Sequence, residues 1–190
     1  MAFSAALGGA SVGLVAVAPV TAAAAQDSNG KPPTWSRLEE SRETKNYKES
    51  IRETGALEDN ARLFLQQTAL PQLALPENRS TIERTRRRMR ELLLDSIEEE
   101  KALDAANRTV LDFMDDLARN GAVEPVVRVN AILLMGDLQS RDRRPWAAAA
   151  KPLASAASDG KLPMAVRIAA LAGLARHVEA VRTGRDDAGQ

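Results

Sequence analysis

The side chains most often used in catalysis are scarce in this chain. His177 is the only histidine among the 190 residues, and there is no cysteine. Disulfides, thiolate catalysis and cysteine-ligated zinc or iron–sulfur sites are therefore excluded. His177 has no carboxylate and no second histidine one helical turn away, so we interpret it as a surface or packing residue.

Two runs of carboxylates are the remaining candidates for acid–base or metal chemistry. Asp115 and Asp116 are adjacent, and glutamates occupy residues 98–100. Neighbouring residues of a helix point in different directions, so solvated faces are the simpler interpretation. The chain also lacks the phosphate-binding, dinucleotide-binding, nucleophile-elbow and zinc-protease motifs. We expect a protein that is not an enzyme, with no cofactor and no metal.

An arginine-rich segment at residues 84–90 is the best candidate for a ligand site. The arginines singled out for contact with phosphates are Arg84, Arg87, Arg88 and Arg90. Glutamates flank the segment and no aromatic residue offers a stacking surface, so a nucleic acid is not the expected ligand. Two hypotheses remain: intramolecular salt bridges, and binding of an anionic polymer or membrane surface with an affinity that falls with salt. The acidic partners expected for the salt bridges are Glu58, Asp59, Asp112, Asp115 and Asp116.

Composition indicates how the chain builds the scaffold for these residues. Lysine plus arginine number 26, as do aspartate plus glutamate, so the formal net charge is zero. Such a balance is not that of a polybasic nucleic-acid binder. Apolar residues make up 44% but aromatic residues only 3%, so alanine, leucine and valine must form the core. This composition favours packed helices over sheet, and we predict an all-α fold.

The N-terminal residues have the layout of a secretory signal peptide. An apolar run of small residues from Ala5 to Ala18 is followed by Ala23 and Ala25, as expected for a cleavage site before Gln26. No basic residue precedes Lys31, so the usual positive start is missing. An uncleaved anchor and a disordered tail remain alternatives. We expect residues 1–25 to be removed, the protein to be exported, and no stable membrane span to remain.

The rest of the N-terminal half has weaker helical patterns. We interpret residues 26–56 as a polar linker with a marginal helix that is ordered only when docked. Residues 57–100 are expected to form a diverged N-terminal helical cap, in which residues 57–69 are helical and residues 71–76 are an extended connector. Ser80 and Glu83 have the spacing of a capping box for the next helix. At the other end, residues 182–190 are interpreted as a polar tail.

An internal repeat is the strongest pattern in the C-terminal half, where residues 118–135 align with residues 157–174. Each segment starts at a turn containing glycine, passes a proline and continues as an apolar helix. The identical pairs include Val127 with Val166, Arg128 with Arg167 and Ala131 with Ala170. A period of about 39 residues made of two antiparallel helices is typical of an α-solenoid. Residues 101–181 are therefore predicted to form two such repeats.

These residues resemble HEAT repeats. Val127-Arg128-x-x-Ala131 and Val166-Arg167-x-x-Ala170 are similar to the start of the family's second helix, and residues 133–138 resemble its closing stretch. In the family the arginine pairs with a turn aspartate six residues earlier, whereas Asn120 and Asp159 lie eight residues earlier here. The resemblance, which extends to secreted bacterial HEAT-like proteins with a degenerate cap, implies a short solenoid of stacked antiparallel helix pairs.

The resemblance implies that the protein is a protein–protein interaction scaffold. The sequence does not identify its partner. The residues expected at the partner site are Asn130, Asp137, Arg141 and Trp146. For Trp146 a place in the core between repeats is the competing interpretation. The last helix, near residues 163–180, keeps an apolar edge. That edge is either capped by the chain itself or docks a partner, and its residues are Ile168, Leu171, Leu174 and Val178.

Overall fold

The computed structural model describes residues 34–187, and this part of the chain is all-α, without a strand. Its α-helices are α1 (Trp35–Glu39), α2 (Arg42–Thr54), α3 (Asp59–Phe64), α4 (Ile82–Leu93), α5 (Glu100–Arg119), α6 (Pro125–Gly136), α7 (Ala150–Ser158) and α8 (Met164–Asp187). Shorter helical segments are η1 (Leu65–Ala69), η2 (Leu70–Ala74), η3 (Pro76–Thr81) and η4 (Ala147–Ala149). The predicted signal peptide lies outside the described residues.

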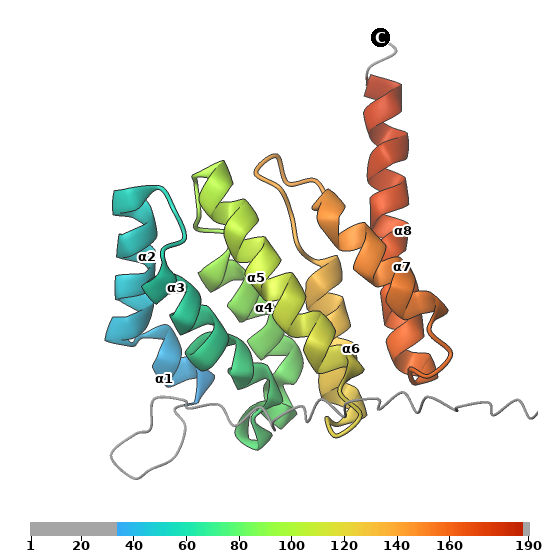
Figure 1. The fold of residues 1–190 in the computed structure, drawn as a ribbon, viewed down its shortest axis with the longest axis horizontal. Helices are drawn as coiled ribbons and strands as arrows, with labels where there is room; N and C mark the ends of the chain where they lie inside the picture. The colour runs from blue at the N-terminus through green and yellow to red at the C-terminus, as the bar shows by residue number, and fades with distance from the viewer. Residues whose placement is uncertain (1–33, 188–190) are drawn as a thin grey trace, which may run out of the picture.

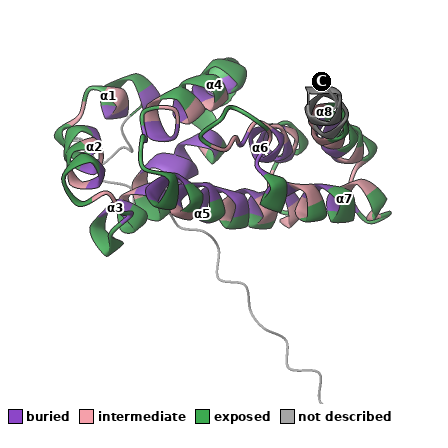
Figure 2. Ribbon diagram, turned by 90° about the horizontal axis from the view of Figure 1, so that it is seen from above, coloured by how far each residue is buried: buried purple, intermediate pink, exposed green. Residues whose placement is uncertain are grey.

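The longer helices form two layers that run side by side along the molecule. One layer contains α3, α5 and α7, and the other contains α4, α6 and α8 (Figures 1 and 2). Helix α6 packs on α5, α4 and α8, and α7 packs on α8. Buried residues line the space between the layers (Figure 2), and most of them are leucine, alanine and other aliphatic residues. The core is therefore built without a large aromatic cluster, as the composition predicts.

Residues 35–54 are not a linker, and the sequence interpretation is wrong there. They form α1 and α2, and Trp35, Leu38, Tyr47 and Ile51 are buried. The apolar spacing fits a single helix poorly because the chain forms two. The hydroxyl of Ser41 accepts a hydrogen bond from the backbone N–H of Thr44 at 3.2 Å, which starts a new helix with a new apolar face.

Residues 57–81 are helical over more of their length than predicted. The predicted helix at 57–69 is α3 followed by the π-helical turn η1, and the predicted extended connector is wrong because η2 is a 3-10 helix. Gln72 is fully buried in η2 and accepts a hydrogen bond from the Asn78 side chain at 3.1 Å. The capping box is also absent, since α4 begins at Ile82 without a side-chain cap.

The last helix is longer than predicted. Residues 182–187 continue α8 instead of forming a tail, so α8 spans 24 residues. Its C-terminal end projects beyond the other helices (Figure 1). Helix α8 also approaches α6 closely, because a Cβ atom on Gly136 would lie 2.9 Å from the Cα of Gly173. Glycine at both positions lets the two backbones meet.

The turns before α6 and α8 contain the same hydrogen bonds at positions that the sequence repeat aligns. The Arg128 Nε donates to the Ala118 carbonyl at 2.7 Å, and the Arg167 Nε donates to the Ala157 carbonyl at 3.1 Å. The side chain of Asn120 accepts from the N–H two residues later at 2.9 Å, as does that of Asp159. Each arginine therefore satisfies a carbonyl at the end of the preceding helix, and the two helix pairs share one local design.

Candidate interaction surface

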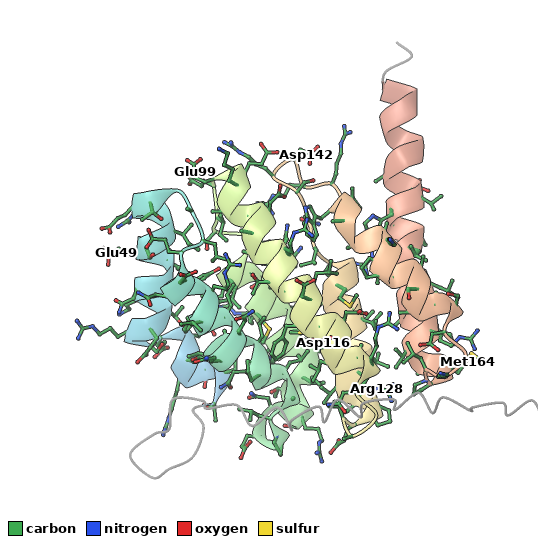
Figure 3. The ribbon with its side chains drawn as sticks, viewed as in Figure 1. Glu49, Glu99, Asp116, Arg128, Asp142 and Met164 are labelled. Carbon is green, nitrogen blue, oxygen red and sulfur yellow. The ribbon has the colours of Figure 1, made fainter. Side chains whose placement is uncertain are left out.

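The candidate catalytic residues do not converge on a site. Glu99 and Asp116 lie toward opposite ends of α5 (Figure 3), and Asp115 is paired with Arg119 at 2.9 Å. Burial, and secondarily the charge of Arg176, lowers the pKa of His177 below its ordinary value. Its Nε2 has no hydrogen-bond partner within the described residues, and no group of three potential ligands in that range could hold a metal ion.

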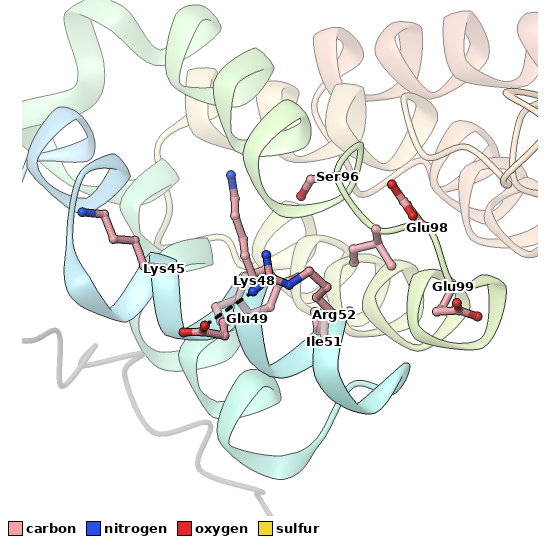
Figure 4. A pocket seen from close by; sticks show the side chains of 10 residues that line it. Lys45, Lys48, Glu49, Ile51, Arg52, Ser96, Glu98 and Glu99 are labelled. Atoms are coloured by element: carbon pink, nitrogen blue, oxygen red, sulfur yellow. Dashed lines mark hydrogen bonds and ion pairs between the residues drawn. The ribbon is translucent and has the colours of Figure 1, made fainter.

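A groove with charged walls lies between α2 and the α4–α5 connection. It has a volume of about 440 Å³ and is lined by Lys45, Lys48 and Arg52 and by three glutamates (Figure 4). The Glu49–Arg52 pair is 3.5 Å apart. Tyr47 also lines the groove, and its hydroxyl donates to the Leu93 carbonyl at 2.8 Å. Because both positive and negative side chains line the groove, it favours neither an anionic nor a cationic ligand. The groove therefore does not indicate a substrate.

Most of the arginines of α4 are held in ion pairs within the chain. Arg86 contacts Asp137, and its Nε lies 3.3 Å from the Asn130 side chain. Arg88 bonds to Glu91 at 2.9 Å and to Glu39, and these bonds raise its pKa. The remaining pairs of the segment are Arg87 with Glu83 at 3.5 Å and Arg90 with Asp95 at 3.2 Å.

None of those partners is among the acidic residues expected from the sequence. Of the four arginines considered for anion binding, Arg84 has no ion pair with another described residue. The other three arginines would have to give up an ion pair within the chain in order to bind an anionic ligand.

Three of the four predicted partner-site residues are engaged inside the fold. Asn130 is buried and donates to the Val126 carbonyl at 2.9 Å. Asp137 lies between Arg86 of α4 and Arg176 of α8. The Trp146 ring is buried, and its Nε1 donates to Asp104 at 2.9 Å. Only Arg141 is exposed, in the loop before η4.

The signature residues of the two predicted repeats occupy equivalent positions. Val127 and Ala131 of α6 are buried, as are Val166 and Ala170 of α8. The arginines that follow the two valines make the turn bonds described above. These residues stabilise the helix pairs and leave no side chain for a ligand.

Most of the exposed large apolar side chains in the described part of the chain lie on α8. Four large side chains point outward from one side of this helix, and each is more than half exposed: Met164 (64%), Ile168 (57%), Leu171 (56%) and Val178 (68%). Ala175 is exposed in line with them. We call these five residues the α8 face. Met164 marks its start, at the end of the molecule away from α1 and α2 (Figure 3).

The sequence repeat aligns the α8 face with the side of α6 that packs on α8. Ile132 and Gly136 lie one turn apart on α6, and Gly136 meets Gly173 of α8. The equivalent residues on α8 are Leu171 and Ala175. Ile132 is fully buried, whereas Leu171 is 56% exposed. The same helical face is thus covered in α6 and uncovered in α8.

Comparison of the chain with family models, curated proteins and solved structures finds no match. The α8 face must therefore be interpreted from its own geometry.

Sequence patterning found only part of this surface. The predicted apolar edge included Ile168, Leu171 and Val178, but Leu174 is half-buried and Met164 was missed. The alternation of steps of four and three residues from 164 to 178 is the pattern that would have found all of it. Along residues 34–187, no helix combines the length and the apolar character that crossing a membrane would require.

Proposed function

We propose that this protein is a non-catalytic protein–protein interaction scaffold built from HEAT-like helix pairs. The observation that carries the proposal is the α8 face, a continuous row of exposed apolar side chains at the end of a helical stack. Proteins seldom leave such a row uncovered unless it binds something. The recurring turn supports the repeat interpretation, because the same bonds form at Arg128 and Arg167.

The other predicted partner-site residues take a supporting role in this proposal. Asn130 and Asp137 contact Arg86 of α4, and Trp146 contacts Asp104 of α5. These residues would therefore shape the scaffold without contacting the partner. Arg141 remains available at the surface. The partner would therefore be bound by apolar contact on α8, with charged residues at the margin.

Anion binding through α4 is the weaker alternative. It would require Arg87, Arg88 and Arg90 to leave Glu83, Glu91 and Asp95. Export of the protein, proposed from residues 1–25, would place its partner in the cell envelope or outside the cell.

A capture experiment with the tagged chain tests the proposal. Envelope and soluble extracts are passed over wild type, Leu171→Glu and the matched control Val126→Glu, an exposed apolar residue of α6 (41%). We expect wild type and the control to retain one protein at low and high salt, and Leu171→Glu to lose it, because apolar contact is insensitive to screening. Retention of many anionic species at low salt only would favour α4 instead.

A further inference from the structure

We propose that the α8 face binds the α8 face of a second copy of this chain, with the two helices antiparallel and Leu171 at the two-fold axis. The inference rests on the proposed function, because it names the partner for the same surface. It makes the scaffold a symmetric dimer in which the rest of each stack is displayed twice.

The spacing of the α8 face is that of a seam between two helices. Its five residues, 164, 168, 171, 175 and 178, alternate in steps of four and three, which is the 3.5-residue period of the a and d positions in a coiled coil. Ala165 and Ala172 are exposed beside this row, and their small side chains leave room for a second helix to approach. The occupant that fits a row with this spacing is another helix.

The two ends of the stack differ in a way that excludes head-to-tail stacking. The outer side of α2, at the N-terminal end, is charged, and its exposed residues include Arg42, Glu43, Lys45, Glu49, Arg52 and Glu53. Covering these charges with the α8 face would remove them from water without apolar contact in return. The apolar end therefore pairs with another apolar end, which gives a closed two-fold dimer instead of a filament.

The packing of α6 on α8 shows that this kind of face accepts a helix. Ile132 and Met135 of α6 are fully buried, and Gly136 of the same helix meets Gly173 of α8. Leu171, Leu174 and Ala175 occupy the equivalent positions on α8. Ala175 is small, as Gly136 is, so a second helix can approach α8 closely at this point.

An antiparallel arrangement matches both the spacing and the charges. Residues 164 and 178 are equally far from Leu171, so Met164 of one copy would face Val178 of the other. A parallel arrangement would instead place the two Glu179 carboxylates together, which is unfavourable.

The dimer should be reversible, because each copy contributes essentially one helix. Specific interfaces bury about 1,200–2,000 Å² in total, and a single helix pair is at the low end of this range. The association must therefore be followed over a range of concentrations, from submicromolar to about 100 µM.

The first test introduces charges at the two-fold axis and measures the dimerisation of the full chain by analytical ultracentrifugation. Leu171→Glu and Leu171→Lys each place like charges in contact across the axis, so we expect each to weaken dimerisation by about 100-fold or more. An equimolar mixture of the two variants should dimerise again. Val126→Glu is the matched control and should dimerise like wild type. A monomeric wild type, or a dimer that Leu171→Glu leaves intact, would overturn the proposal.

Single cysteines test the direction of the helices, since the chain has none of its own. Under mild oxidation Leu171→Cys should form a disulfide between copies. Val178→Cys should not, because the two copies of residue 178 would be about 21 Å apart along antiparallel helices at about 1.5 Å per residue. Cross-linking through both positions would show a parallel pair and overturn the register proposed here.

The capture experiment separates this inference from the proposed function. A chain that stays monomeric but loses a captured protein on Leu171→Glu would keep the scaffold function and refute the dimer. A monomeric chain whose captured proteins are indifferent to Leu171→Glu would refute both.

Discussion

Asp137 connects three helices of one layer through one carboxylate. It lies at the end of α6 and contacts Arg86 of α4 and Arg176 of α8. The side chains of Asp137 and Arg86 are only 18% and 12% exposed, so this pair is screened by water much less than a surface pair. The carboxylate was expected at a partner site from sequence, and its role in the fold is instead to join neighbouring helices.

Asp137→Asn should destabilise the protein strongly. It keeps the shape of the side chain but leaves the half-enclosed Arg86 without its counter-charge, so we expect the free energy of unfolding to fall by about 3 kcal/mol, the lower limit for a buried pair. Urea denaturation measures the change. Asp142→Asn is the matched control on an exposed loop, and its effect should stay within about 1 kcal/mol. An equal fall in the free energy of unfolding in the two variants would contradict the role assigned to Asp137.

At the scale of elements, the sequence prediction succeeded where the apolar spacing is regular and failed where it is interrupted. The apolar spacing of the last helix is regular, and it was predicted near residues 163–180, where α8 begins at Met164 but continues to Asp187. Residues 35–54 were misinterpreted because the restart at Ser41 changes the phase of the apolar face. The roles of Asn130 and Asp137 could not be predicted, because their partner Arg86 lies 44 and 51 residues away in the chain.

The contact between α6 and α8 leads to a prediction at the same scale. Gly136→Ala would place a Cβ atom 2.9 Å from the Cα of Gly173, so the two helices must move apart. We expect a loss of about 1–3 kcal/mol of stability, as for other overpacked sites. Gly121→Ala is the control, since nothing lies within 4 Å of its Cβ position. Thermal denaturation of both variants decides the matter, and a Gly136→Ala protein as stable as the control would show that the helices separate freely.

At the scale of the whole molecule, Tyr47 joins α2 to α4 and makes the stability of the protein depend on pH in the alkaline range. Burial raises the pKa of Tyr47 above its ordinary value near 10. Above pH 10 the unfolded chain releases this proton more readily than the folded chain does, so the free energy of unfolding falls as the pH rises. Below pH 10 the contribution is fully present.

Tyr47→Phe should remove this pH dependence. We expect the variant to lose about 1 kcal/mol at neutral pH, because the Leu93 carbonyl loses its donor, and to lose stability less steeply than wild type between pH 9.5 and 11. Urea denaturation across that range measures the difference between the two proteins. Tyr47 is the only tyrosine, so its ultraviolet absorbance reports its ionisation directly. Ionisation near pH 10 in the folded chain would contradict the prediction.

The recurring turn also bears on how the length of such a chain can change by mutation. Arg128 and Arg167 close their turns with the same bonds, so a tandem duplication of the codons from one arginine to the next would insert one helix pair with both junctions already formed. A deletion of the same size would join two compatible ends. Any other length would rotate the following helix and turn its apolar side toward water. Natural variation in this region should therefore occur in whole multiples of one helix pair.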